Sequence, residues 1–176
     1  MIDPAHAAIR ALLETHYTAT LATVSAEGPW AAAVFFASDA DLNLYFVSDP
    51  RTRHGRDLAA HPEVAATIHA DSGTWLEVRG LQLAGRVEVL DGPAREVGLG
   101  RYLAKFPDVK ILIERPRGED EETIAKRLRG ATLYRLTSYW IRLIDNSRGF
   151  GYKQEITIGA GETRGAERWQ RGNQAK

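Results

Sequence analysis

The sequence of 176 residues contains no cysteine, which excludes disulfides, zinc–thiolate sites, iron–sulfur clusters and thiol nucleophiles. Its 23 lysines and arginines balance 23 aspartates and glutamates, so no overall field draws it to nucleic acid or to a membrane, although a local basic cluster stays open. No apolar run approaches the ~18 residues of a membrane span. Because the first ten residues lack the apolar stretch of a signal peptide, we expect a soluble cytoplasmic protein.

Several short segments are rich in β-branched and aromatic residues, as strands are. The turns between them are short, which implies antiparallel pairing, because a parallel crossover needs about a dozen residues or more. Gly80 and Gly85 lie within the longest segment and predict bends there. The expected strands are residues 18–25, 30–37, 42–48, 64–70, 74–90 and 131–145.

Helical patterns flank these strands. Asp3 and Pro4 predict the start of a first helix that ends near residue 16, and Pro62 ends a short second one. Many antiparallel strands with few helices favour a mostly β fold with peripheral helices, a small closed or split barrel, over a sandwich. We expect one domain over residues 1–158 and a polar, Gly-rich tail over residues 159–176, with Trp169 as its anchor. The other expected helices are residues 52–60, 93–106 and 119–129.

One local charge anomaly lies where the third strand meets the second helix. Arg51, Arg53, His54 and Arg56 sit in or beside the first turn of a helix that begins near Thr52. A helix N-terminus carries partial positive charge, so each exposed cation there costs about 0.3–1 kcal/mol. A bound phosphate would reverse this effect and would meet hydroxyl groups, free N–H groups and a guanidinium. The alternative is a solvated basic turn in which Thr52 only caps the helix.

The order and spacing of several segments resemble the pyridoxamine 5'-phosphate oxidase-like, FMN-binding split barrels. The resemblance covers about residues 15–155 and implies a six-stranded antiparallel split β-barrel of the FMN-binding type. It also implies a homodimer with FMN in a groove between the subunits and a small-molecule substrate. The segments that carry it are residues 20–24, 27–29, 34–35, 44–48, 51–54 with 57–58 and 61–62, 85–90 and 140–146.

The same resemblance implies which residues hold the cofactor. The segment from Thr52 to His54 would bind the FMN phosphate, Val47 and Ser48 would follow the ribityl chain, and the backbone at Val34 would face the isoalloxazine ring. Arg79 and Gly80 match a family arginine–glutamine pair, although Gly80 has no amide. For Arg142, Arg148 and Lys153, a place beside the flavin and a plain surface position both remain open. The candidate cofactor-binding residues are Val34, Phe35, Val47, Ser48, Arg51, Thr52, Arg53, His54, Arg79, Gly80, Arg142 and Lys153.

The substrate end departs from the family pattern. Tyr102 matches a family tyrosine, but the residues of the substrate-phosphate clamp fall on Phe106 and Lys110, and a family histidine falls on Ile144. A phenylalanine cannot replace a bidentate phosphate clamp, so pyridoxamine 5'-phosphate oxidase activity itself is not predicted. The chain looks closer to small bacterial members of the superfamily.

We therefore expect an FMN-dependent oxidoreductase that passes hydride or electrons to a small molecule. The flavin would carry the chemistry, and no catalytic side chain is identified. Three alternatives remain: a deazaflavin-dependent reductase with the same groove, a flavin- or haem-binding module without turnover, and an interaction domain with no cofactor.

Two further groups of side chains are expected to be structural. Trp30, Phe35, Phe36 and Trp75 should lie mainly in the barrel core rather than stack on a ligand, because aromatic residues on strands usually pack. The histidines outside the basic turn lack metal-ligand spacing, so no metal site is expected. They are His6, His16, His61 and His69.

Overall fold

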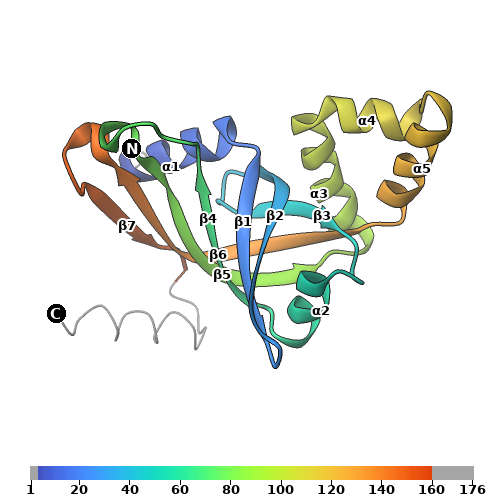
Figure 1. Ribbon diagram of the computed structural model, residues 1–176, viewed down its shortest axis with the longest axis horizontal. Helices are drawn as coiled ribbons and strands as arrows, with labels where there is room; N and C mark the ends of the chain where they lie inside the picture. The colour runs from blue at the N-terminus through green and yellow to red at the C-terminus, as the bar shows by residue number, and fades with distance from the viewer. Residues whose placement is uncertain (1–3, 160–176) are drawn as a thin grey trace.

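The computed structural model describes residues 4–159, which form seven strands and five α-helices (Figure 1). The strands pair in the order β3-β2-β1-β4-β5-β6-β7, and a further β3–β6 pairing closes the first six into an antiparallel barrel. The expected split barrel is confirmed, with β7 outside the closure. The strands are β1 (Thr18–Ser25), β2 (Gly28–Ser38), β3 (Leu44–Ser48), β4 (Glu63–His69), β5 (Arg79–Val89), β6 (Thr132–Asp145) and β7 (Lys153–Thr157).

The longest strand, β6, pairs with two different strands along one of its edges. Its first half, residues 132–136, pairs with β3, whereas residues 140–144 pair with β7. On its other edge β6 pairs with β5, and the register shifts between Ala84 and Gly85. A Cβ at Gly85 would lie 2.5 Å from the carbonyl oxygen of Thr137, so glycine is required at this bulge. The bend predicted at Gly85 is confirmed, whereas Gly80 lies in regular pairing.

Two helices lie at opposite ends of the barrel. Figure 1 shows α1 (Pro4–Thr15) above it and α2 (Arg53–Ala60) below it. Apolar side chains of α1 recur at helical spacing, so the helix buries one face, including Ile9 and Leu13, in the barrel core. Strand side chains such as Leu21, Phe36 and Phe46 complete that core.

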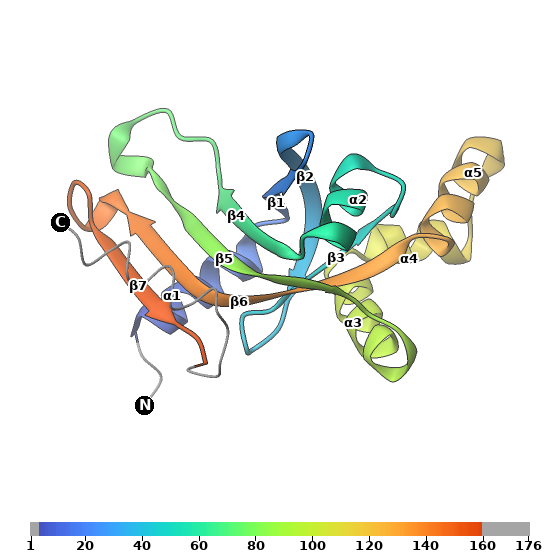
Figure 2. The same cartoon turned by 90° about the horizontal axis from the view of Figure 1, so that it is seen from below.

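The other three helices form an insertion between β5 and β6, on one side of the barrel (Figures 1 and 2). They are α3 (Gly92–Lys105), α4 (Pro107–Glu114) and α5 (Gly118–Arg129). The helix expected over residues 93–106 stops at Lys105, because Pro107 starts a new helix with Phe106 as its N-cap. Within residues 4–159, no helix combines the length and apolar character needed to cross a bilayer.

Three aromatic side chains expected in the core are exposed instead. Trp30 is 43% exposed, Phe35 56% and Trp75 55%, whereas Phe36 is fully buried. The exposed three lie against partners outside the core: an arginine for Trp30, Phe106 for Phe35 and a second ring for Trp75. These three aromatic side chains therefore make contacts at the protein surface instead of packing in the barrel core.

The strand expected over residues 74–90 begins late. Trp75 to Glu77 form a 3₁₀ turn, and pairing starts at Arg79, because residues 74–78 lie exposed in the connection from β4. The predicted cap Asp3 and the predicted tail anchor Trp169 lie outside the described residues.

Candidate functional site

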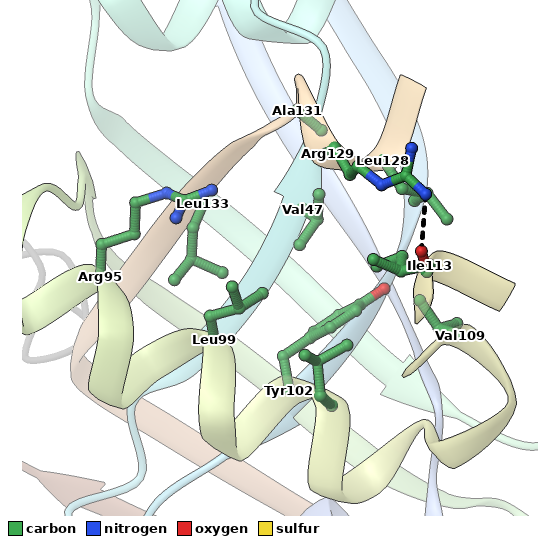
Figure 3. Close-up of a pocket in the computed structure, with 11 residues that line it drawn as sticks. Val47, Arg95, Leu99, Tyr102, Val109, Ile113, Leu128, Arg129, Ala131 and Leu133 are labelled. Atoms are coloured by element: carbon green, nitrogen blue, oxygen red, sulfur yellow. Dashed lines mark hydrogen bonds between the residues drawn. The ribbon is translucent and has the colours of Figure 1, made fainter. Parts of the chain in front are cut away.

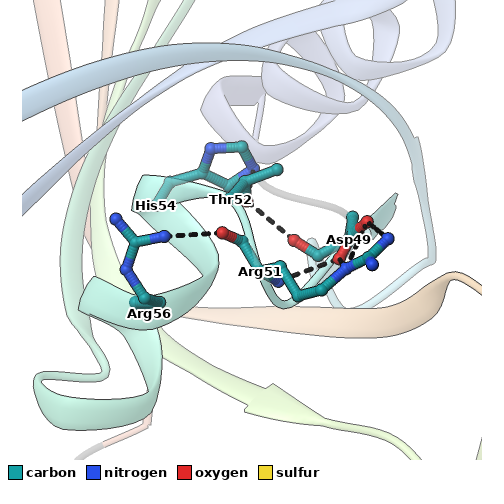
Figure 4. A network of polar contacts seen from close by, with 5 residues as sticks. All are labelled: Asp49, Arg51, Thr52, His54 and Arg56. Atoms are coloured by element: carbon teal, nitrogen blue, oxygen red, sulfur yellow. Dashed lines mark hydrogen bonds and ion pairs between the residues drawn. The ribbon is translucent and has the colours of Figure 1, made fainter.

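The candidate phosphate site is the junction between β3 and α2, where the chain turns sharply (Figure 4). Thr52 caps α2 as predicted: its Oγ1 accepts a hydrogen bond from the Gly55 amide at 3.2 Å and donates one to the Asp49 carbonyl at 2.7 Å. A Cβ at Gly55 would lie 2.7 Å from the carbonyl oxygen of Pro50. Glycine at this position therefore lets the turn fold against the first turn of the helix.

Three predicted residues converge at this helix start, and we call them the Ser48–Thr52–His54 cluster. The Nε2 atom of His54 lies 2.7 Å from the Ser48 hydroxyl and 3.2 Å from the Thr52 hydroxyl. Partial burial lowers the pKa of His54 below its usual 6.5, and the negative charge of Asp57 opposes this only in part. The ring is therefore mainly neutral at pH 7. Two hydroxyls and an imidazole at a helix N-terminus can bind an anion.

Two of the predicted cations at this turn already have partners. Arg51 is 88% exposed and forms an ion pair with Asp49, with 2.6 Å between Nη2 and Oδ2. Hydrogen bonds from Arg51 hold the pKa of Asp49 down to about 2, so this carboxylate is ionised. Arg56 donates from Nη1 to the carbonyl oxygen of Arg51 at 2.6 Å. The local charge is thus partly neutralised within the turn.

Arg53 ties α2 to the turn between β1 and β2. Its Nη2 donates to the carbonyl oxygens of Glu27 at 3.1 Å and Gly28 at 3.3 Å, and its guanidinium lies 4.7 Å from the ring centre of Trp30. Its buried Nε atom has no hydrogen-bond partner among residues 4–159, and the Glu27 carboxylate is 3.9 Å away. Internal contacts thus explain the crowding of cations without an anion. The fit to a phosphate therefore depends on the Ser48–Thr52–His54 cluster.

Asp57 is a positioning residue that the charge pattern did not single out. It is buried and accepts a hydrogen bond of 2.8 Å from the Thr23 hydroxyl of β1. Burial raises its pKa, but hydrogen bonds from Thr23 and Ser25 and the charge of Arg53 outweigh that effect and lower the pKa overall. The ionised carboxylate thereby anchors α2 beneath the cluster. A buried acid paired with a strand hydroxyl 34 residues away leaves no local sequence signal.

The predicted residues of β2 and β3 lie in elements next to this junction. Val47 precedes Ser48 on β3, and the Val34 side chain is buried in the barrel core. Phe35 instead points outward, with its ring 5.5 Å from that of Phe106. Its exposed ring is thus available to a flat ligand, while the backbone of β2 pairs with β1 up to this residue.

The remaining predicted residues form a second group, on β5, β6 and β7. Arg79 pairs with Asp145 at 3.4 Å, Gly80 lies opposite Ile144, and Lys153 begins β7. Arg142 forms an ion pair of 2.7 Å with Glu155. Figures 1 and 2 both place β7 well apart from α2. A single chain therefore does not bring the two groups together.

A shallow groove of about 300 Å³ lies on the outer sheet face between the two groups. Small residues follow one another across its strands, since Ala22 pairs with Ala65, Ala65 with Ala84, and Ala84 with Trp140. Trp140 and Arg142 also line the groove. We call this surface the alanine face. Within residues 4–159, no group of three or more His, Asp or Glu side chains lies together as metal ligands would.

Comparison with known proteins relates this chain to a protein family and to individual bacterial proteins. The family model described as pyridoxamine 5'-phosphate oxidase matches residues 5–129. A UPF0306 protein of Photorhabdus laumondii is 29% identical over 146 residues, which cover 82% of this chain and 90% of the relative. A UPF0306 protein of Yersinia pestis is 27% identical over 146 residues, with 82% and 88% covered.

Solved structures share the barrel at lower identity. The haem-binding protein of Mycobacterium smegmatis superposes with a TM-score of 0.67 at 21% identity, covering 89% of this chain. The present chain spans 59% of that protein's length. Campylobacter jejuni ChuZ gives a TM-score of 0.67 at 16% identity, with 93% and 67% covered. At these identities the likeness concerns the fold alone.

Proposed function

Because the chain belongs to the pyridoxamine 5'-phosphate oxidase family, we propose that it is a cytoplasmic flavoprotein that binds FMN without a covalent bond. The observation that carries this proposal is the Ser48–Thr52–His54 cluster at the N-terminus of α2, the helix that begins with Arg53. A bound FMN supplies transfer of hydride or electrons to a small molecule.

In this proposal the junction binds the phosphate end of the cofactor. The Ser48 hydroxyl turns its proton toward the phosphate oxygens, and the first turn of α2 adds a favourable dipole. Thr52 keeps its proton on the Asp49 carbonyl and holds the start of the helix in place. The approaching negative charge raises the pKa of His54, so its ring takes up a proton and becomes a charged donor. Arg56, which donates only to a neutral carbonyl, adds positive potential at the same turn, whereas Asp49 offsets the charge of Arg51.

We further propose that a second copy packs on the alanine face, so that the β5–β7 group of one subunit approaches the cluster of the other. Small side chains let two sheets approach closely, and the exposed stripe of Ala22 and Ala65 offers a flat contact with little side-chain entropy to lose. A site completed by two copies also accounts for the separation of the two groups within one chain.

The first test compares FMN with riboflavin, which lacks the phosphate. The protein loaded with FMN should be yellow, with absorption near about 450 nm, and should bind FMN more tightly than riboflavin. In this proposal Ser48, which contacts His54, binds the phosphate rather than the ribityl chain. Ser48→Ala should therefore weaken FMN binding several-fold and leave riboflavin unchanged, whereas Ser72→Ala, at an exposed loop serine, should change neither. Equal affinity for the two flavins would refute the phosphate site.

Arg53→Ala provides a second arm of the same test. Since hydrogen bonds to charged groups contribute about 1.5–3 kcal/mol, loss of this guanidinium should weaken FMN binding about 10-fold or more. Arg101→Ala, at an exposed position of α3, is the matched control. The unfolding midpoint of each variant is measured alongside, because Arg53 also holds the β1–β2 turn. FMN affinity unchanged in a folded Arg53→Ala variant would count against the proposal.

The subunit contact is tested at Ala65, which is exposed in the single chain. Ala65→Glu should convert a dimer to a monomer in sedimentation and weaken FMN binding in parallel, whereas Ala104→Glu on α3 should do neither. A wild-type protein that sediments only as a monomer at micromolar concentration would refute the shared site. Binding of haem with a Soret band, or of a deazaflavin in preference to FMN, would replace the FMN assignment.

A further inference from the structure

A second cavity, of about 200 Å³, lies between the helical insertion and the barrel (Figure 3). Helices α3, α4 and α5 form one side, and the ends of β3 and β6 form the other. An engineered apolar cavity of about 150 Å³ is large enough to bind benzene, so this one has room for a single substituted ring. Its apolar walls include Val47, Leu99, Leu103, Ile113, Leu128 and Leu133.

Tyr102 places a polar group inside this apolar cavity. Its side chain is buried, and its hydroxyl has no hydrogen-bond partner among residues 4–159. Burial raises the pKa of Tyr102, so the phenol stays protonated and can donate. The hydroxyl keeps access to the cavity, so a ligand atom that lies there can accept its hydrogen bond in place of water.

Two arginines also line the cavity, and they differ in whether their side chains already have hydrogen-bond or ion-pair partners. Arg129 donates to the carbonyl oxygen of Ile113 at 2.7 Å and pairs with Glu122 at 3.3 Å. The Arg95 side chain, by contrast, makes no hydrogen bond or ion pair within the described part of the chain. In Figure 3 its guanidinium lies beside Leu133, and it is separated from the Tyr102 hydroxyl by Leu99. An available cation therefore lies at one end of the cavity and a phenol donor at the other.

We propose that this cavity binds a single-ring aromatic carboxylate with a polar substituent opposite the carboxylate. The carboxylate meets the Arg95 guanidinium, the ring lies between Leu99 and Leu133, and the far substituent accepts a hydrogen bond from Tyr102. The pairing of an apolar body with a charged end follows the general design of small-molecule sites. The inference goes beyond the cofactor proposal and stands whether or not the β3–α2 junction holds FMN.

The test uses 4-hydroxybenzoate as the probe, titrated into the full-length protein by calorimetry and by amide-resolved NMR. Benzoate lacks the far hydroxyl, and 4-hydroxybenzamide lacks the charge. We expect 4-hydroxybenzoate to bind more tightly than either and to shift amides of α3, α4 and β6. Equal binding of the three probes, absence of binding at millimolar concentration, or shifts confined to other elements would overturn the proposal.

Two variants assign the ends of the ligand. Arg95→Ala should weaken binding of 4-hydroxybenzoate about 10-fold or more and leave the weaker binding of 4-hydroxybenzamide unchanged. Arg101→Ala, on the same helix but exposed, is the control. Tyr102→Phe should weaken 4-hydroxybenzoate several-fold and leave benzoate unchanged, while the ring keeps its contact with Phe106. If Arg95→Ala weakens acid and amide equally, the charge assignment is wrong. Since each readout is binding of the probe, loss of FMN binding does not affect the outcome.

Discussion

The packing of α3 on the barrel can be tested with two glycines that differ in one respect. Gly98 and Gly100 both lie within α3, where alanine is favoured over glycine by about 0.8–1.0 kcal/mol. A Cβ at Gly98 would lie 2.9 Å from Cδ1 of Tyr45 and 3.0 Å from Cδ2 of Leu133. A Cβ at Gly100 would meet no atom within 4 Å. Only Gly98 is therefore required by a close approach of the helix to the sheet.

Gly100→Ala should raise the free energy of unfolding by about 0.5–1 kcal/mol. Gly98→Ala gains the same helix propensity but forces the Tyr45 ring and the helix apart, which costs about 1–3 kcal/mol. The two variants should thus differ by about 1–3 kcal/mol, or several degrees in Tm at about 2–4 °C per kcal/mol. Urea unfolding measures the first quantity and calorimetry the second.

Equal stabilisation of both variants would refute the packing derived for α3. Leu133 is also a wall of the second cavity, so Gly98→Ala should weaken binding of 4-hydroxybenzoate as well. Gly100→Ala should leave that binding unchanged. The pair therefore separates a change in stability from a change in the shape of the cavity.

Three other predictions concern titration and packing. The pKa of His54 is lowered in the free protein, and a bound phosphate raises it, so FMN affinity should increase as the pH falls from about 8 to about 6.5. Calorimetry in two buffers should detect the uptake of a proton when FMN binds. If His54→Asn still takes up that proton, His54 is not the group that titrates. Gly85→Ala places a methyl group 2.5 Å from the Thr137 carbonyl oxygen and should destabilise the fold by about 1–3 kcal/mol, whereas wild-type stability in urea would show that the bulge is not needed. Lys105 donates to the Leu13 carbonyl at the end of α1, so Lys105→Met should cost about 0.3–1 kcal/mol in the same assay, and no cost would mean that the contact contributes nothing.

Local patterns predicted most of the fold because they record burial directly. Strand β1 runs over the predicted residues 18–25, since buried and exposed side chains alternate along it and turns bound it. The edge strand β7 was missed because its residues, such as Lys153 and Glu155, are mainly polar. Helix α4 was missed because its eight residues are too few for a clear helical period. Residues 74–78 look like a strand but have no partner strand to pair with.

At the candidate site, the sequence predicted the helix cap but not the pairing of the charged side chains. The sequence identified Thr52 as a cap and placed His54 beside it, because both signals lie within one turn. It could not show that Arg53 reaches back to Glu27 and Trp30, since those contacts join segments more than 20 residues apart. The cations were therefore interpreted as awaiting an anion, whereas tertiary contacts already satisfy much of their bonding.

The irregular pairing near Gly85 has a consequence for how the outer surface of the barrel could evolve. Before it, even-numbered residues of β6 such as Leu136 point inward, and after it the odd-numbered Ile141 and Leu143 do so. Tyr139, the residue without a partner on β5, thereby exchanges the two sides of the strand. Deleting that one residue would leave Ile141 facing the interior and Arg142 facing the solvent, because the remaining residues of β6 would then alternate without interruption. The loss of a single codon here would therefore remove the bulge and keep the same side chains on the outer surface.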